Sequence, residues 1–143
     1  MTILDTNVVS ELMRLIPSPV VLAYLRRVDP DQMFTTSITE AEIRLGVVSL
    51  PAGNRRETLA MKMEILLDQE FRTRILPFDV GSARVYAHLV ANRRRAGPPI
   101  SIPDAQIAAI ALSRNATLAT RNVRDFELCQ LPLINPWEQA LPA

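Results

Sequence analysis

Short hydrophobic runs alternate along this chain with longer segments whose hydrophobic residues recur every three or four positions. Short runs are typical of buried strands, and the longer spacing is typical of helices that pack on a sheet. We expect strands at residues 3–4, 33–36, 75–76, 117–120 and 133–134. We expect helices at 20–28, 37–50, 55–71, 80–95 and 101–115, with a turn or short helix at 8–13. This alternation predicts an α/β fold, with a parallel sheet of about five strands covered by helices on both faces.

Proline and glycine mark the boundaries between these segments. Pro51-Ala52-Gly53-Asn54 is the clearest break, and Gly97-Pro98-Pro99 ends the helix before it. We find no internal repeat, and we expect residues 1–143 to form a single domain. In parallel sheets of this kind, ligands bind beyond the carboxyl ends of the strands, where the strand order reverses. Asp5 directly follows the first strand, so it stands in the right kind of place for a binding residue.

The composition narrows the class of protein. Hydrophobic residues make up 48% of the chain, which argues against disorder. The 16 basic and 15 acidic residues give a net charge of +1, so attraction to nucleic acid must come from local patches. Cys129 is the only cysteine, which excludes an intrachain disulfide and a thiolate zinc site. We see no signal peptide and no hydrophobic run near the ~20 residues that span a bilayer, so we expect a cytoplasmic protein that does not bind membranes.

The acidic residues at element junctions carry the candidate chemistry, and each has a structural alternative. Asp5 is favoured either as the N-cap of the next turn or as a group facing a cation. Asp104 follows Ser101 in a capping-type pattern and also suits the helix dipole. Asn122 follows the strand at 117–120, and its carbonyl oxygen is an uncharged ligand. Asp125 is either a turn residue or a more distant acid.

Glu42 lies in a segment with two candidate capping boxes, Ser37 with Glu40 and Thr39 with Glu42. Because the preceding strand ends at residue 36, Ser37 is the more economical cap, which leaves Glu42 without a structural role. A carboxylate that is free of capping near a strand end favours a functional interpretation.

A parallel sheet would bring these acids to one edge. Clustered carboxylates repel each other unless a cation holds them, and Mg²⁺ binds through a few carboxylates, water and substrate phosphates. The chemistry that follows is metal-assisted hydrolysis of a phosphodiester.

Four segments, in order and over nearly the whole chain, resemble the PIN-domain ribonucleases. They are ILDTNVVSEL, SITEAEIRLGV, IPDAQIAAIA, and LATRNVRDF followed by INPW. More narrowly, they resemble the VapC-type toxins of bacterial toxin–antitoxin pairs, including the FitB-like branch. The resemblance implies a three-layer α/β/α fold and a Mg²⁺- or Mn²⁺-dependent endoribonuclease that acts on RNA. It also implies a homodimer inhibited by a cognate antitoxin, in an assembly that reaches operator DNA only through that antitoxin.

The resemblance also implies roles for individual residues. Asp5, Glu42 and Asp104 match the acidic positions that hold the metal, and the polar positions around them match Thr6, Asn7, Ser37 and Thr120. Asn122 departs from the pattern, because many relatives carry Asp there. The loss of this charge leaves open whether one or two metals bind, and Asp125 is a candidate to compensate.

Other features keep two interpretations open. The run Arg93, Arg94 and Arg95 is either a solvated helix end or a phosphate contact for RNA. We expect a surface or packing role for His88, a buried Cys129, and an anchoring role for Trp137. The hydrophobic stripe Leu59, Met63, Leu66 and Leu67 is typical of a core, although the resemblance allows it to bind the partner.

The sequence lacks GxGxxG, a P-loop and a nucleophile elbow, which argues against nucleotide-binding and serine-hydrolase classes. The alternative to an enzyme is a catalytically weak PIN-like binding module that works mainly in a toxin–antitoxin complex on DNA. Asn122 is the residue that keeps this alternative open.

Overall fold

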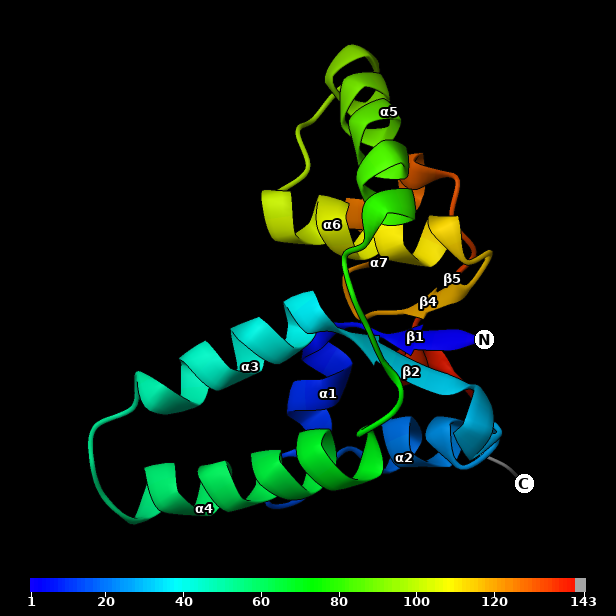
Figure 1. The fold of residues 1–143 in the computed structure, drawn as a ribbon. Coiled ribbons are helices and arrows are strands. Elements are labelled where there is room, and N and C mark those ends of the chain that lie inside the picture. The colour runs from blue at the N-terminus through cyan, green and yellow to red at the C-terminus, as the bar shows by residue number, and fades with distance from the viewer. Residues whose placement is uncertain (141–143) are drawn as a thin grey trace.

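The structure is a computed structural model, and it describes residues 1–140. Within these residues a parallel sheet has the order β3-β2-β1-β4-β5 (Figure 1). The strands are β1 (Thr2–Leu4), β2 (Met33–Thr36), β3 (Ile75–Leu76), β4 (Thr117–Ala119) and β5 (Leu133–Ile134). The register places Ile3 beside Phe34 of β2 and Leu118 of β4, so β1 is the central strand.

Helices cover both faces of this sheet, and the predicted three-layer α/β/α fold is confirmed. The α-helices are α1 (Thr6–Leu12), α2 (Pro19–Leu25), α3 (Ser37–Val48), α4 (Asn54–Met63), α5 (Val80–Ala96), α6 (Ile102–Ser113) and α7 (Val123–Phe126). A π-helix, η2 (Glu64–Glu70), continues α4, and short 3-10 turns are η1 (Pro30–Gln32), η3 (Glu127–Cys129) and η4 (Pro136–Glu138). Figure 1 shows α5, α6 and α7 on one face of the sheet and α1, α2 and α4 on the other.

The two faces have separate hydrophobic cores because neighbouring strand residues point to opposite sides. Ile3 and Leu118 pack with α5 and α6, whereas Leu4 and Ala119 pack with α1 to α4. The central strands are buried on both faces, as expected for a parallel sheet. This burial holds the carboxyl ends of β1 and β4 in fixed positions.

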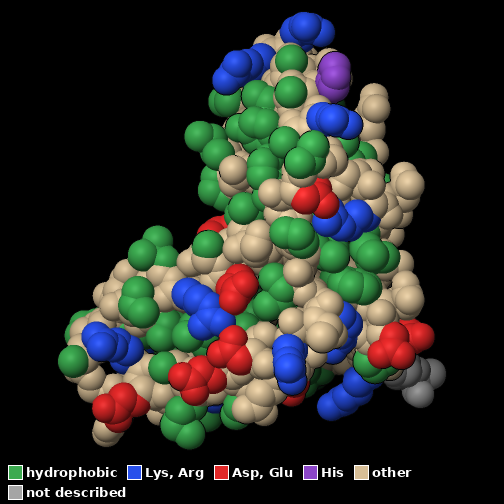
Figure 2. All heavy atoms as spheres, viewed as in Figure 1, with side chains coloured by type: hydrophobic (Ala, Val, Ile, Leu, Met, Phe, Trp, Pro, Cys, Tyr) green, Lys and Arg blue, Asp and Glu red, His purple; other side chains and the backbone are tan. Residues whose placement is uncertain are grey.

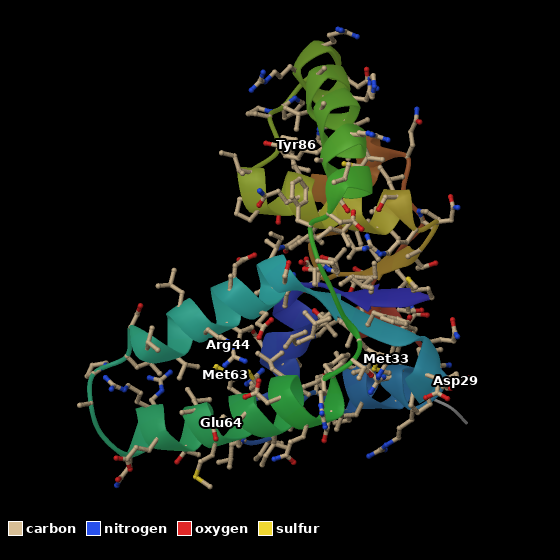
Figure 3. The ribbon with its side chains drawn as sticks, viewed as in Figure 1. Asp29, Met33, Arg44, Met63, Glu64 and Tyr86 are labelled. Carbon is tan, nitrogen blue, oxygen red and sulfur yellow. The ribbon has the colours of Figure 1, made fainter. Side chains whose placement is uncertain are left out.

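Helices α3 and α4 form an arm that extends to one side of the sheet (Figure 1). Arg44 of α3 reaches toward the α4–η2 segment (Figure 3). Its guanidinium donates to Glu40 Oε1 at 2.8 Å and to Asp68 Oδ1 of η2 at 2.6 Å. Acidic and basic side chains are mixed over this arm on the visible face, while hydrophobic side chains gather over α5 and α6 (Figure 2).

The predicted strands are confirmed, and the differences lie at helix ends. Helix α2 ends at Leu25 instead of residue 28. The helix expected at 55–71 is divided, because α4 ends at Met63 and the Phe71 N–H donates to the Leu66 carbonyl, five residues back, at 2.9 Å. Helix α7 was not predicted, since a four-residue helix has too few residues to show a period. No helix within residues 1–140 is long and hydrophobic enough to cross a membrane.

Candidate active site

The strand order reverses between β1 and β4, because the chain builds β2 and β3 on one side of β1 and then β4 and β5 on the other. A crevice forms beyond the carboxyl ends of strands at such a reversal. Asp5 follows β1 there, and Thr120, Arg121 and Asn122 follow β4. The predicted location of Asp5 at a ligand-binding edge therefore agrees with the topology.

A pocket of about 550 Å³ opens at this edge. It brings together the predicted acids Asp5, Glu42 and Asp104, which come from three different segments. The rest of its lining is polar or aromatic, and consists of Thr6, Asn7, Ser10, Glu11, Arg14, Arg121, Asn122 and Trp137. The sequence placed most of the acidic residues of this pocket correctly.

Asp5 is both a helix cap and a pocket residue, so the two interpretations of this residue are compatible. Its side chain is almost fully buried, and its residue is 4% exposed. Oδ1 accepts the backbone N–H of Thr6 at 2.8 Å, at the start of α1. Oδ2 accepts the hydroxyl of Thr120 at 2.7 Å, and that hydroxyl oxygen also accepts the N–H of Asn122 at 3.0 Å. These bonds fix the carboxylate between the ends of β1 and β4.

Glu42 lies on the second turn of α3 and is more exposed than Asp5. Its Oε1 accepts the Thr6 hydroxyl at 3.2 Å, and the Thr6 hydroxyl also lies 3.1 Å from that of Thr39. The expectation that Glu42 has no capping role is confirmed. The expected cap is wrong, however: Thr36 and not Ser37 caps α3, with Thr36 Oγ1 accepting the Thr39 N–H at 3.1 Å.

Asp104 lies in the first turn of α6, after Pro103. The hydroxyl of Ser101 accepts the Asp104 backbone N–H at 3.3 Å, so the predicted capping pattern is confirmed. The cap uses the backbone of Asp104 and leaves its carboxylate to line the pocket.

Burial raises the pKa values of all three carboxylates, and the charges of other acids add to this. Burial raises the pKa of Asp5 to about 6, and the negative charges of Asp104 and Glu42 add to this, against the hydrogen bonds from Thr120 and Thr6. Burial also raises the pKa of Glu42, with a contribution from Asp104. Burial first, and then the charge of Asp125, raises the pKa of Asp104. A positive charge in the pocket would relieve this repulsion.

Three of the predicted polar or acidic residues lie outside the pocket lining: Ser37, Thr120 and Asp125. Ser37 is the first residue of α3, beside the capping Thr36. Asp125 lies on α7, where its backbone carbonyl accepts an N–H of Arg93 at 2.9 Å. Asn7 and Thr120 are closer to the site, since Asn7 Oδ1 accepts the Arg121 N–H at 3.2 Å and Thr120 binds Asp5.

Sequence reasoning missed five residues of the pocket, which are Ser10, Glu11, Arg14, Arg121 and Trp137. Glu11 is buried, and its carboxylate accepts from Arg14 and from the Ser18 backbone N–H. Arg121 lies over the ring of Trp137, with its guanidinium carbon 4.9 Å from the ring centroid. Glu11 and Arg14 are only three residues apart, so their spacing was a signal that sequence reasoning could have used. Arg121 and Trp137 lie 16 residues apart, and no local pattern connects them.

The three arginines at the end of α5 differ in exposure. Arg93 is 5% exposed, so its interpretation as a solvated residue or an RNA contact is wrong. Its guanidinium donates to the carbonyls of Asp125 and Pro98 and to the thiol of the buried Cys129. Arg94 and Arg95 are exposed, as is His88.

The pocket has the donor set of a hard-cation site. All three predicted ligands present carboxylate oxygens, which suit Mg²⁺ and Mn²⁺. Within residues 1–140 no three acidic, histidine or cysteine side chains lie close enough together to hold a metal ion by themselves. Mg²⁺ binds through one or two carboxylates with several waters and substrate phosphates, so an open, acidic pocket fits it without a closed cage.

Comparisons with known proteins show the family to which the chain is similar. The PIN domain family model matches residues 2–129. The chain is 39% identical to the VapC ribonuclease Y4jK of Sinorhizobium fredii over 98% of this chain and 100% of the relative. It is 36% identical to Toxin FitB of Neisseria gonorrhoeae, over 96% of this chain and 99% of that protein.

Among solved structures, a structure of FitAB bound to an IR36 DNA fragment contains a chain with the same fold. The two chains superpose with a TM-score of 0.90 at 36% identity, covering 98% of each. The similarity extends over both layers of helices and the whole sheet, and it includes the segments that line the pocket.

Proposed function

This chain belongs to the PIN-domain family, and from this premise we propose that it is an endoribonuclease that acts as the toxin of a toxin–antitoxin pair. The observation that carries the proposal is the gathering of Asp5, Glu42 and Asp104 around one pocket where the strand order reverses. Relatives named as a VapC ribonuclease and a FitB toxin match nearly the whole chain, which supports the same activity.

The proposed cofactor is Mg²⁺, with Mn²⁺ as an alternative, held by the carboxylates of Asp5, Glu42 and Asp104. When bound, it would supply an activated water and stabilise the charge on the leaving oxygen of the phosphodiester. The chain's own contribution is to fix the carboxylates: Thr120 and the Thr6 N–H hold Asp5, and the Thr6 hydroxyl holds Glu42. Fixed ligands lose little entropy when the cation and the RNA phosphate arrive.

Asn122 lines the pocket with an uncharged amide. A carboxylate at this position would bind a second cation more tightly than the amide does. A single metal is therefore the simpler arrangement for this chain. The same residue favours the alternative function, a catalytically weak binding module in a toxin–antitoxin complex on DNA.

The proposed partners are a cognate antitoxin and, through it, operator DNA. The similar FitAB complex is bound to a DNA fragment, and this supports the proposal for the present chain. The net charge of +1 fits a chain that reaches DNA through another protein. We also propose a homodimer, as part of a higher assembly with the antitoxin. We further propose that the chain acts in the cytoplasm, where its proposed RNA substrate is found.

The test is an incubation of purified, partner-free chain with structured and single-stranded RNAs, in the presence of Mg²⁺, Mn²⁺ or EDTA. We expect cleavage that requires metal and is lost in Asp104→Asn, an isosteric variant that removes one carboxylate charge. The matched control is Asp31→Asn, which removes the charge of an exposed acid outside the pocket lining and should cleave at a rate within a few-fold of the wild type.

No cleavage of any RNA by folded, metal-loaded chain would favour the binding module. Equal cleavage by Asp104→Asn and the wild type would contradict the proposed site, even if the chain is a ribonuclease.

A further inference from the structure

One wall of the carboxylate pocket is basic and aromatic. Arg14, Arg121 and Trp137 line the same pocket as Asp5, Glu42 and Asp104. A polyanionic substrate is repelled by the acids, so a cation on this wall would help to bring the phosphate backbone into the pocket. The two arginines are not equivalent, because they differ in what already binds them.

Arg14 is held by an acidic residue of its own helix region. Its Nη1 lies 3.2 Å and 3.3 Å from the two carboxylate oxygens of Glu11, a residue that is 5% exposed. This pairing compensates part of the guanidinium charge, although the Arg14 side chain is 66% exposed. Arg14 is therefore a weaker candidate for a phosphate contact than an arginine without an acidic partner.

Arg121 has no such partner. Within residues 1–140 its guanidinium forms no ion pair, and its side chain takes part in no hydrogen bond. Its position is nevertheless defined, because its guanidinium lies over the Trp137 ring and its backbone N–H donates to Asn7 Oδ1 at 3.2 Å. The residue is exposed at the carboxyl end of β4, beside Asn122.

This geometry suits a phosphate. A guanidinium binds phosphate oxygens through two parallel N–H groups, and a planar contact with an aromatic ring holds its plane while its N–H edges stay free. Arginine planes and aromatic rings also stack on the unpaired bases of RNA. The wall thus offers a charge held over an aromatic ring, and a stacking surface, next to the carboxylates.

We propose that Arg121, held over Trp137, binds an RNA backbone phosphate next to the scissile bond and thereby offsets the repulsion from the carboxylates. The identity of the ligand as RNA rests on the proposed function. Arg121 is a substrate-binding residue in this assignment, and Trp137 positions it.

The test uses the full chain in EDTA, so that binding is measured without cleavage. A labelled single-stranded RNA is titrated with protein, and its anisotropy gives the affinity. Because Trp137 is the only tryptophan in the sequence, its fluorescence reports on the same wall in an unlabelled titration. We expect the RNA to change this fluorescence in a saturable manner in the wild type.

Arg121→Gln should weaken RNA binding by about tenfold, the effect of one charge-assisted contact. It should also lower the slope of log affinity against log salt by about 0.7, the value for one phosphate contact on a single strand. The matched control is Arg124→Gln, which removes the same charge from an exposed residue of α7 outside the pocket lining. It should bind within about twofold of the wild type.

Equal affinities for Arg121→Gln and the wild type, or equal losses in both arginine variants, would overturn the proposal. A second measurement separates it from the proposed function. In the metal-loaded cleavage assay, Arg121→Gln should raise KM and change kcat little, and a change in kcat with unchanged KM counts against a binding role. If Arg121 governs RNA binding but no RNA is cleaved, the ribonuclease proposal fails and the binding site stands.

Discussion

Asp5 shows a conflict between folding and chemistry at the scale of one residue. Its carboxyl group is 4% exposed, and burial raises its pKa to about 6. The ionised form of Asp5 is therefore less favourable in the folded chain than in the unfolded chain. A proposed metal ligand must be ionised, so the position that favours cation binding is destabilising when no cation is present.

This conflict predicts how stability depends on pH. Below about pH 4 Asp5 is protonated in both states, and between about pH 4 and pH 6 only the folded chain keeps the proton. Stability therefore falls as pH rises through this window, by about 3 kcal/mol in total for this group. Asp5→Asn removes the loss, so in metal-free buffer at about pH 7.5 the variant should exceed the wild type in stability by up to that amount.

Urea denaturation at about pH 4 and about pH 7.5 checks this expectation. The difference between Asp5→Asn and the wild type should grow with pH, whereas the difference for Asp31→Asn, which removes an exposed acid outside the pocket, should not. A wild type that gains stability over the variant as pH rises would show that the buried charge is not destabilising.

The sequence located single residues well where a strand end fixes the position. Asp5 and Asp104 were placed because one follows β1 and the other opens α6. The cap of α3 was shifted by one residue, since Thr36 and Ser37 have equivalent hydroxyls and only the backbone decides between them. Trp137 was assigned to anchoring, because its contact with Arg121 joins elements that no local pattern connects.

At the scale of elements, Arg93 joins three segments around the site. From α5 it donates to the Pro98 carbonyl in the turn before α6, at 3.3 Å, and to the Asp125 carbonyl of α7, at 2.9 Å. Helix α6 carries Asp104, and Asn122 directly precedes α7. The Nε atom of Arg93 is buried without a hydrogen-bond partner in the described residues. This unpaired N–H lowers the stability that the other hydrogen bonds of Arg93 provide.

Arg93→Met should destabilise the fold by about 2 kcal/mol, because it removes charge-assisted hydrogen bonds and leaves buried acceptors without donors. Arg94→Met, one residue further along the same helix and exposed, should stay within about 0.5 kcal/mol of the wild type. Thermal and urea unfolding measure both variants. Equal stability of the two would show that the buried guanidinium contributes nothing net to the fold.

The elements themselves differed in how far the sequence predicted them. Strands and the long α5 followed from hydrophobic runs and from the prolines and glycines between them. The π-helix after α4 did not, because adjacent Leu66 and Leu67 are both buried and fit either helical period within a few residues. Hydrophobic spacing over one or two turns cannot separate these periods.

At the scale of the whole molecule, the sequence predicted a parallel sheet but not its strand order. All strands have similar hydrophobic runs, so the neighbours of each strand are decided by helix packing on both faces. The order β3-β2-β1-β4-β5 places the reversal beside β1 and forms the pocket from segments far apart in sequence. The site is therefore a property of the topology as much as of its residues.

A cation that binds only the folded chain should stabilise the whole molecule. Mg²⁺ or Mn²⁺ should raise the Tm of the wild type at about pH 7.5, and this rise should shrink as pH falls below 6, where Asp5 takes up a proton. Asn122→Asp adds a carboxylate to the pocket, so its Tm should rise more with metal than that of the wild type.

Differential scanning fluorimetry over a metal titration makes this comparison, with Ca²⁺ as a test of selectivity and Asp104→Asn as the variant that should respond least. A Tm independent of metal at about pH 7.5 would contradict a cation site at these carboxylates.

The hydrogen bond between Thr120 and Asp5 joins residues 115 positions apart, and this separation has a consequence for synthesis. At translation rates of about 5–20 residues per second, Asp5 leaves the peptidyl transferase centre roughly 6 to 23 seconds before Thr120 is added. Until β4 arrives, β1 has only β2 beside it, and Asp5 lacks its hydroxyl donor. A ribosome that stalls midway therefore releases a fragment without the pocket, so only a message translated past β4 produces a chain that can damage the cell's RNA.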